Sequence, residues 1–502
     1  MKKLKKFFAI ALTAIMMMTM AISAFAVEPV NNQTDHTYEV YQIFAGTQSE
    51  TDTEGKLAIS DWGTGIRGAD FLAGLKASDK FGTPNIFASA TNAVEVAEIL
   101  ANASSVQARA FGDLASAYLT AVKTEVTGNT IDLAAGYYLI VDTTDVNGTD
   151  DAKNVSLLQV TKKGTFDIEK KYNVPSVEKK VKDIDDSVDT VHTDWQDSAD
   201  YDIGDVIPFQ LTGTLPTNYA DYETYKYIFN DTMSDGLTYN NDARVYVVNG
   251  TAQTEVTASF DMSGAIGTIS CANLKAIEGV TITNESKIVV EYTATLNSKA
   301  VIGAEGNPNT VNLEYSNNPN FGGDGDMGKT PDDTVIVFTY KLTVNKIDAE
   351  KKPLKGAEFK LYKVLENGAE QEIKTVTIVD ENTTSFDFEG LDAGSYILRE
   401  TKVPAGYNGI EDIEFLVTAE HEIVSDSPVL TSLTGLTETG EITFTPDLEA
   451  GSLSTDIINK SGSVLPETGG IGTTLFYIFG AALAIFAGVL LVVKKRMSSS
   501  EN

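Results

Sequence analysis

Cysteine is almost absent from this chain, with Cys271 the only one among 502 residues. An intramolecular disulfide is therefore impossible, and we expect Cys271 to be a small buried residue. Histidine is scarce as well: the three are His36, His192 and His421. So few, so far apart in the sequence, supply little for a zinc centre or a charge relay. Surface or strand roles are expected for them, and no metal or other cofactor is expected.

Basic residues are also in short supply, since 38 Lys and Arg stand against 71 Asp and Glu. The formal charge of -33 argues against nucleic-acid binding, which needs concentrated Lys and Arg. Hydrophobic residues make up 42% of the chain, which is enough for packed cores and against wholesale disorder. At roughly 100–200 residues a domain, the length predicts about three domains.

The N-terminus has the pattern of a secretory signal peptide over residues 1–26. An apolar core spans residues 7–22, and Ala24-Phe25-Ala26 forms a small-x-small cleavage site. The positive segment before the core consists of Lys2, Lys3, Lys5 and Lys6. The bulk of the chain is therefore expected outside the cell.

The C-terminus, residues 463–502, combines three features in a fixed order. The pentapeptide Leu465-Pro466-Glu467-Thr468-Gly469 comes first, the apolar run 473–493 follows, and Lys494-Lys495-Arg496 ends the series. At ~1.5 Å per residue the run can span the ~30 Å core of a bilayer, and the basic cluster keeps the tail cytoplasmic. The series resembles the cell-wall sorting signal of Gram-positive surface proteins. That resemblance implies cleavage by a sortase between Thr468 and Gly469, with the Thr468 carbonyl passed to an amine.

Between these ends the sequence predicts an all-β fold of three tandem Ig-like sandwiches, because short alternating segments are separated by turn residues throughout. The expected domains are 27–172, 173–339 and 340–462. In the first domain an Ala-rich stretch from about Ala69 to Val122 has apolar residues at helical spacing, which predicts a helical insertion.

The first and third domains share a local pattern. Residues 133–142, LAAGYYLIVD, parallel residues 391–400, LDAGSYILRE, and residues 37–44 parallel 358–365 with Tyr41 matching Tyr362. We interpret the pattern as two copies of one strand arrangement.

The third domain contains a group of residues that suggests covalent chemistry. Lys346 lies in its first strand on the face of Leu342 and Val344, and Asn459 lies in its last strand on the face of Ile457. An inward lysine, an inward amide and a buried carboxyl from Glu400 would be costly as unpaired groups. They fit together as reactants: a desolvated amine becomes a neutral nucleophile, and a protonated carboxyl polarises the amide.

The segment 396–407, YILRETKVPAGY, resembles the E-box of collagen-adhesin B-type domains, with Glu400 as its acid. The order of the whole chain resembles a sortase-assembled major (shaft) pilin of the fimbrial isopeptide-forming family. Motifs that carry the resemblance further include residues 41–44 (YQIF), 231–237 (DTMSDGL), 315–319 (YSNNP) and 330–334 (TPDDT).

For the second domain the resemblance implies another bond. Lys179 shares a face with Val177 and Val181 and is preferred to Lys180. The partner lies in a later strand, where Asn317 shares the Leu313/Tyr315 face and is preferred to Asn318. Asp231 is expected to be the promoting acid, with Glu291 as the alternative.

The first domain should lack such a bond. The repeat puts Asp142 where Glu400 stands, but the sequence has no lysine between Lys6 and Lys56 to supply the amine. Shaft pilins also carry an acceptor lysine near the end of this domain. Here the segment is FDIEKKYNVP, and Lys171 is the first choice with Lys170 as the alternative, while Lys162 and Lys163 remain open.

The resemblance therefore implies a non-enzymatic, peptidoglycan-anchored shaft subunit of a cell-surface pilus. Its partners would be a pilus-polymerising (class C) sortase, a housekeeping sortase, identical subunits, accessory pilins and peptidoglycan. The competing hypothesis is a monomeric wall-anchored adhesin or a tip or base pilin. Nucleotide binding is excluded: residues 323–330 match GxxxxGK[ST], but their aspartates would repel phosphate and Pro331 follows at once.

Overall fold

The computed structural model describes residues 36–48, 57–128, 130–153, 155–160, 163–168, 173–184, 186–187, 194–263, 267–319, 326–437 and 442–462. The chain folds into two compact units. Unit 1 comprises residues 1–174, 216–226 and 314–329; unit 2 comprises 175–215, 227–313 and 330–502. Each is described separately.

Unit 1 is built on a sheet in the order β2-β1-β5-β6, with β3 paired to β1. A two-stranded sheet, β4 with β7, completes its β structure, and β20 pairs with the end of β19 at Glu314–Ser316. The strands are β1 (Thr37–Gln48), β2 (Leu57–Trp62), β3 (Thr124–Thr127), β4 (Thr130–Leu133), β5 (Gly136–Asp142), β6 (Val155–Val160), β7 (Gly164–Asp167) and β20 (Met327–Lys329).

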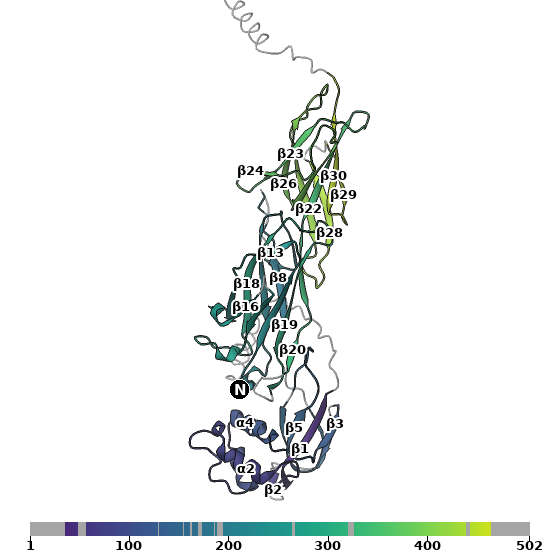
Figure 1. Cartoon of the computed structure of the whole chain (residues 1–502). Coiled ribbons are helices and arrows are strands. Elements are labelled where there is room, and N and C mark those ends of the chain that lie inside the picture. The colour runs from purple at the N-terminus through teal and green to yellow at the C-terminus, as the bar shows by residue number, and fades with distance from the viewer. Residues whose placement is uncertain are drawn as a thin grey trace, which may run out of the picture. The chain divides into compact units, whose positions relative to one another are not determined.

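The helices of unit 1 lie between β2 and β3 in the sequence, and Figure 1 shows α2 and α4 beside the β1/β2/β5 sheet. They start with recognisable caps: the Asn92 side chain accepts from Glu95 N at 3.0 Å, and Ser104 forms a capping box with Gln107. Their apolar faces pack on the sheet through an aromatic core. The helical elements are α2 (Gly68–Ala77), η1 (Asp79–Phe81), α3 (Ala93–Ala101), α4 (Ser105–Ser116) and η2 (Tyr219–Asp221).

In unit 2 the first sandwich has two sheets that face each other across buried aliphatic and aromatic side chains. One sheet has the order β15-β14-β18-β11-β8-β9, with β13 on β18; its strands are β15 (Ala252–Glu255), β14 (Arg244–Asn249), β18 (Lys287–Leu296), β11 (Val206–Gly213), β8 (Val177–Lys182), β9 (Trp195–Gln196) and β13 (Leu237–Tyr239). The other has the order β10-β21-β19-β12-β17-β16; its strands are β10 (Ser198–Asp200), β21 (Asp333–Phe338), β19 (Asn307–Ser316), β12 (Tyr227–Met233), β17 (Thr268–Cys271) and β16 (Asp261–Ser263). Two short 3₁₀ turns are η3 (Thr257–Ser259) and η4 (Leu274–Ala276).

The second sandwich of unit 2 pairs its first and last strands directly. Strands β22 and β30 run parallel, with Lys341 opposite Ser452 and Asp348 opposite Asn459. The sheets are β25-β22-β30-β29 and β24-β23-β26-β27-β28. Their strands are β25 (Ser385–Leu391), β22 (Tyr340–Asp348), β30 (Ser452–Asn459), β29 (Thr445–Asp447), β24 (Glu370–Ile373), β23 (Glu358–Val364), β26 (Gly394–Lys402), β27 (Ile413–His421) and β28 (Leu430–Leu436).

The predicted all-β class with a helical insertion is confirmed. The division into three domains at 172 and 339 stays a prediction.

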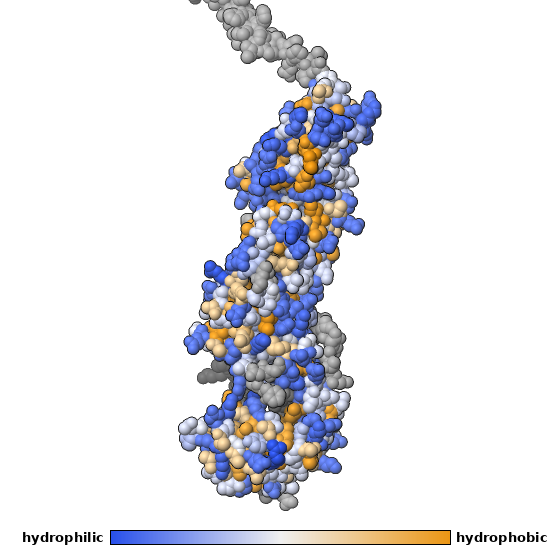
Figure 2. Space-filling model, in the orientation of Figure 1, coloured by the Kyte–Doolittle hydropathy of each residue, from blue (hydrophilic) through white to orange (hydrophobic). Residues whose placement is uncertain are grey.

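Alternation of buried and exposed residues explains most strands: β18, for example, buries every second residue from Ile288 to Leu296 while most of its intervening side chains reach toward the surface. Figure 2 shows mostly hydrophilic side chains on the visible face of the β22–β30 region, broken by a few apolar patches.

The repeat between the first and third predicted domains is confirmed by strand register. In unit 1, β1 and β5 pair so that Tyr41 faces Leu139 and Tyr38 faces Asp142. In unit 2, β23 and β26 pair so that Tyr362 faces Ile397 and Phe359 faces Glu400. Residues that correspond in the two segments are thus paired with residues that also correspond.

Candidate functional site

Lys346, Glu400 and Asn459 meet in the interior of the second sandwich of unit 2. The Lys346 Nζ contacts Asn459 Oδ1 and lies 3.5 Å from Glu400 Oε1. The Asn459 amide nitrogen donates to Glu400 Oε1 at 2.8 Å and Oε2 at 3.2 Å. Lys346 and Asn459 are fully buried, and so is the Glu400 side chain. The carboxyl therefore contacts both the amine and the amide nitrogen.

The strands explain this meeting. Lys346 and Asn459 come from the parallel neighbours β22 and β30, where Lys346 pairs with Ile457, two residues before the asparagine. Glu400 reaches across from β26 in the opposite sheet. Burial lowers the pKa of Lys346, although the Glu400 carboxylate works in the other direction. An amine with a lowered pKa is more readily neutral and nucleophilic.

A second buried site lies between the two sheets of the first sandwich of unit 2. Lys179 of β8 contacts the Asp231 carboxylate from β12, and its Nζ is 2.7 Å from Asn309 Oδ1 on β19. The hydroxyl of Tyr292, on β18, lies 2.9 Å from the same Nζ. Lys179 and Asn309 are completely buried, and Asp231 is nearly so.

The electrostatics of this second site resemble those of the first. Burial lowers the pKa of Lys179, against the opposing effect of the Asp231 charge and hydrogen bond. Burial also raises the pKa of Tyr292 well above its usual range, with Asp231 adding to the shift. The phenol therefore keeps its proton at neutral pH.

The sequence-based choice of Asn317 as the partner of Lys179 needs correction. The structure puts Asn309 against the amine, whereas Asn317 donates to the main-chain oxygens of Val146 at 2.8 Å and Asp151 at 2.9 Å. The second choice, Asn318, donates to Asp326 at 3.1 Å. The two-residue period of a strand explains the error. Asn309 and Asn317 are an even number of residues apart and share one face, so the period alone does not tell which of them lies opposite Lys179.

Glu291 and Lys180 both lie apart from this second site. The Glu291 carboxylate, next to Tyr292 in β18, accepts from Gln210 at 2.9 Å and points to the opposite face of the strand. The amine of Lys180 pairs with Asp197 at 2.5 Å and with Glu178 at 3.2 Å. Lys179 and Asp231 are thus the predicted residues that the structure brings together.

In unit 1 the carboxyl that replaces Glu400 has a histidine beside it. The buried His36 ring contacts Asp142 through Nδ1 at 2.5 Å and Asp151 through Nε2 at 2.8 Å. Burial lowers its pKa, but the hydrogen bonds and charges of the two carboxylates outweigh burial and raise the pKa to about 9. His36 is therefore an internal cation, and the expectation of a surface or simple strand role was wrong for this residue.

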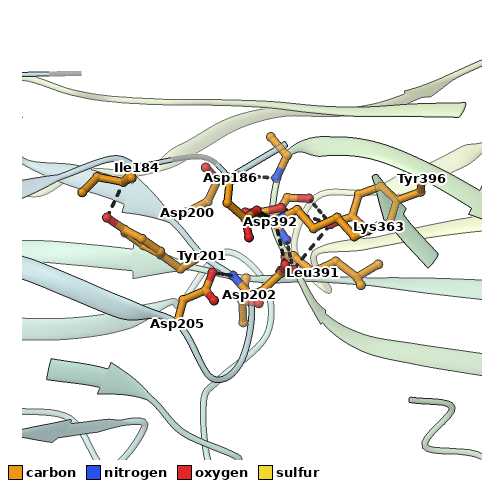
Figure 3. Close-up of polar contacts among 12 residues, drawn as sticks. Ile184, Asp186, Asp200, Tyr201, Asp202, Asp205, Lys363, Leu391, Asp392 and Tyr396 are labelled. Atoms are coloured by element: carbon orange, nitrogen blue, oxygen red, sulfur yellow. Dashed lines mark hydrogen bonds and ion pairs between the residues drawn. The ribbon is translucent and has the colours of Figure 1, made fainter. Parts of the chain in front are cut away.

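A third buried lysine in unit 2 has different surroundings (Figure 3). The Lys363 amine, on β23, lies 2.7 Å from Asp202 and 2.7 Å from Asp392, and it also pairs with Asp186. The three carboxylates outweigh burial and raise the pKa of Lys363 far above its usual range. An amine held charged in this way is a structural ion, not a nucleophile.

Several predicted site residues lie outside the described residues. They are Lys170 and Lys171, the further candidate Lys162, and the pentapeptide Leu465-Pro466-Glu467-Thr468-Gly469, together with the signal peptide and the C-terminal apolar run. In the part of the chain that the structure describes, none of the helices is apolar and long enough for a membrane span. Cys271 is buried, as expected.

The sequence reasoning missed Asn309 and Tyr292. Asn309 had a usable signal: it lies two residues before Val311 and four before Leu313, and all three share the inward face of β19. Tyr292 faces inward with Val290 and Ala294, but its sequence context did not distinguish it from an ordinary aromatic core residue.

Models of three known families match the chain. A Gram-positive pilin backbone subunit 2, Cna-B-like domain matches residues 203–319, and a prealbumin-like fold domain matches residues 340–427. The LPXTG cell wall anchor motif matches residues 457–499.

A curated relative and two solved structures are also similar. The Trypsin-resistant surface T6 protein of Streptococcus pyogenes serotype M6 is 27% identical, over 65% of this chain and 70% of the relative. The solved T6 backbone pilin of serotype M6 S. pyogenes is 18% identical, with a TM-score of 0.47 over 86% of this chain and 96% of that one. The full-length major pilin SpaD of Corynebacterium diphtheriae is 14% identical, with a TM-score of 0.41 over 86% and 90%.

Proposed function

We propose that this chain is a sortase-assembled Gram-positive backbone pilin, that each subunit is joined to the next through Thr468, and that each carries two internal Lys–Asn isopeptide bonds. The family is structural and not enzymatic, and its members are anchored in the cell wall as surface pili. The matching pilin-backbone domain and anchor motif support this assignment over a monomeric adhesin.

For assembly we propose the following order. A pilus-polymerising class C sortase cleaves between Thr468 and Gly469 and passes the Thr468 carbonyl to Lys171 of the next subunit, with Lys170 as the alternative acceptor. A housekeeping sortase then attaches the finished fibre to peptidoglycan. Accessory pilins enter the same fibre through the same linkage chemistry.

The internal bonds are proposed at Lys346–Asn459 and Lys179–Asn309. In each, the neutral amine attacks the amide carbon, the nearby carboxyl moves protons, and the amide nitrogen leaves as ammonia. Glu400 promotes the first bond and Asp231 the second. By the loop-entropy estimate used for disulfides, a cross-link that closes a loop of roughly 100 residues contributes on the order of 4–5 kcal/mol.

One observation carries this proposal: both asparagine carbonyl oxygens contact a fully buried lysine amine whose pKa is lowered by burial. Buried Lys, Asn and acid side chains are expensive to bring together without a reaction that removes their charges. The product amide is neutral, so the reaction removes that cost.

The mass of the folded secreted chain tests the proposal. We expect the wild type to be lighter than its formula by one ammonia per bond, two in all. Glu400→Ala should restore one ammonia and leave the Lys179 bond, and Asp231→Ala should restore the other. Digestion then assigns each loss, because a branched peptide must contain both the lysine and its asparagine. A wild type at its full formula mass would remove the isopeptide proposal while leaving the pilin assignment intact.

A further inference from the structure

The two buried sites differ in how the acid reaches the amide nitrogen that must leave. In the Lys346 site, Glu400 touches that nitrogen directly, at 2.8 Å from Asn459 Nδ2. In the Lys179 site the acid is the shorter aspartate Asp231, and the leaving nitrogen of Asn309 instead donates to the Tyr292 hydroxyl at 2.9 Å. That hydroxyl in turn bonds to Asp231 Oδ2. A phenol thus stands where the longer carboxylate stands in the other site.

Neighbouring aromatic rings and hydrogen bonds fix the Tyr292 side chain in this position. Its ring stacks on Phe209 with centroids 5.4 Å apart, and Tyr239 meets it edge-on at 5.9 Å. Its hydroxyl contacts three groups of the reaction: the attacking amine of Lys179 at 2.9 Å, the leaving nitrogen of Asn309 at 2.9 Å, and the Asp231 carboxyl. A tyrosine buried only for packing needs a single polar partner for its hydroxyl.

We propose that Tyr292 is a catalytic residue, a proton relay between Asp231 and the departing nitrogen of Asn309, an inference that rests on the proposed Lys179–Asn309 bond. The reaction starts from the neutral amine and the neutral acid, with the acid proton on Oδ2 beside the phenol. The amine attacks the Asn309 amide carbon, and a bond forms between Lys179 Nζ and that carbon.

The protons then move in one circuit. Lys179 passes a proton to Asp231 Oδ1 as Oδ2 gives its proton to the phenol oxygen, and the phenol gives its own proton to Asn309 Nδ2. The bond from carbon to Nδ2 breaks, and ammonia leaves. Asp231 and Tyr292 end in the protonation states in which they began, so one amine and one amide become one secondary amide and ammonia. No oxidant or other reactant is needed.

The experiment follows the two bonds in one molecule over time. The full chain is synthesised in a detergent-containing cell-free system, samples are denatured in acid at intervals, and the branched peptides are quantified after digestion. In Tyr292→Phe we expect the Lys179–Asn309 peptide to form about 100-fold more slowly than in the wild type, since proton transfer contributes about that factor or more. The Lys346–Asn459 peptide should appear at the wild-type rate and so show that the second sandwich of unit 2 has folded.

Two further variants separate proton transfer from packing. Tyr239→Phe removes the hydroxyl of the neighbouring ring, which accepts from Ala243 N at 2.9 Å and not from the site, and it should leave both rates unchanged. A more acidic fluorotyrosine at position 292 keeps the ring and the hydroxyl but should change the rate of the Lys179–Asn309 bond alone.

The outcomes are distinct. If Tyr292→Phe forms the Lys179–Asn309 peptide at the wild-type rate, or if the fluorotyrosine leaves the rate unchanged while Tyr292→Phe slows it, the relay is overturned and the bond stands. If the wild type never yields that peptide, the bond itself is refuted.

Discussion

Three fully buried lysines of unit 2, Lys179, Lys346 and Lys363, differ in the charge that surrounds them. Lys179 and Lys346 each contact one carboxylate and an asparagine amide oxygen, and burial lowers their pKa values. Lys363 faces three carboxylates, and its pKa is raised. The direction of each pKa shift therefore follows the number of carboxylates in contact with the buried amine, although all three amines are equally hidden from water. The neutral amine that the proposed bonds need is favoured at Lys179 and Lys346 and not at Lys363.

His36 gives a prediction at the same scale. Its pKa is raised from 6.5 to about 9, so it contributes stability that is fully present below pH 6.5 and is lost as the pH rises through about 9. The difference is about 3 kcal/mol at 1.36 kcal/mol per pKa unit. Calorimetry of the folded chain should show the unfolding transition of unit 1 moving to lower temperature between pH 6.5 and pH 10.

The matched variant is His36→Gln, which has no charge to lose over that range. Among the described residues, Tyr38 also faces the imidazole: its ring stacks on His36 at 5.9 Å, and burial raises its pKa beyond the range of the experiment. His36→Gln should be less stable than the wild type at pH 6.5 and should show a flatter pH dependence. Equal slopes for the two proteins would contradict the assignment of His36 as the titrating cation.

At the scale of strands, alternation identified which face of a segment turns inward but not where along the segment a contact falls. In the Lys346 site, β22 and β30 are the first and last strands of the sandwich and run parallel as neighbours. Their order in the sequence therefore indicated both the inward face of Lys346 and Asn459 and their position along the strands. In the Lys179 site the asparagine that contacts the amine, Asn309, lies within β19, where several successive alternate residues face inward. Asn309 is selected by its position beside β12 in the same sheet and opposite Lys179 of β8 in the facing sheet.

The sequence also could not predict the acidic partners of Lys363 and His36, which come from distant turns and loops. Lys363 is on the inward face of β23 beside Leu361, which sequence alternation can indicate, but its partners Asp202 and Asp392 come from turns that follow β10 and β25. Charges that pair through such distant turns leave no periodic signal. The same holds for Asp151, which reaches His36 from a loop between β5 and β6.

The position of the asparagine in β19 gives a second prediction. Asn309→Ala should abolish the branched peptide that contains Lys179, because the amide carbon that the amine attacks is gone. Asn317→Ala is the control: it removes two hydrogen bonds to main-chain oxygens but leaves the Lys179 contacts intact. The intact mass should fall short of the formula mass by one ammonia in Asn309→Ala and by two in Asn317→Ala. A missing bond in Asn317→Ala together with a normal bond in Asn309→Ala would restore the sequence-based choice.

At the scale of the whole chain, the near absence of cysteine fits a protein that is cross-linked without disulfides. A secreted protein with a single cysteine cannot use disulfides, and both proposed cross-links need only a buried lysine, an asparagine and an acid. Each acts within one sandwich of unit 2. The first predicted domain has the acid, Asp142, but a histidine as its cationic partner, and an imidazole so placed forms an ion pair instead of an amide.

Polymerisation gives the last prediction, because the proposed assembly needs one acceptor amine per subunit. Lys171 and Lys170 precede Asn173 at the end of the first predicted domain, and either amine could receive the Thr468 carbonyl. Denaturing gels of cell-wall extracts should show a ladder of covalent multimers for the wild type. Lys171→Ala should abolish it if Lys171 is the acceptor, and Lys170→Ala should do so if the acceptor is Lys170; the double variant should leave monomer only. Lys163→Ala serves as the control for loss of a nearby lysine. A ladder that survives the double variant would exclude both residues, and a ladder lost in Lys163→Ala alone would move the acceptor to that earlier lysine.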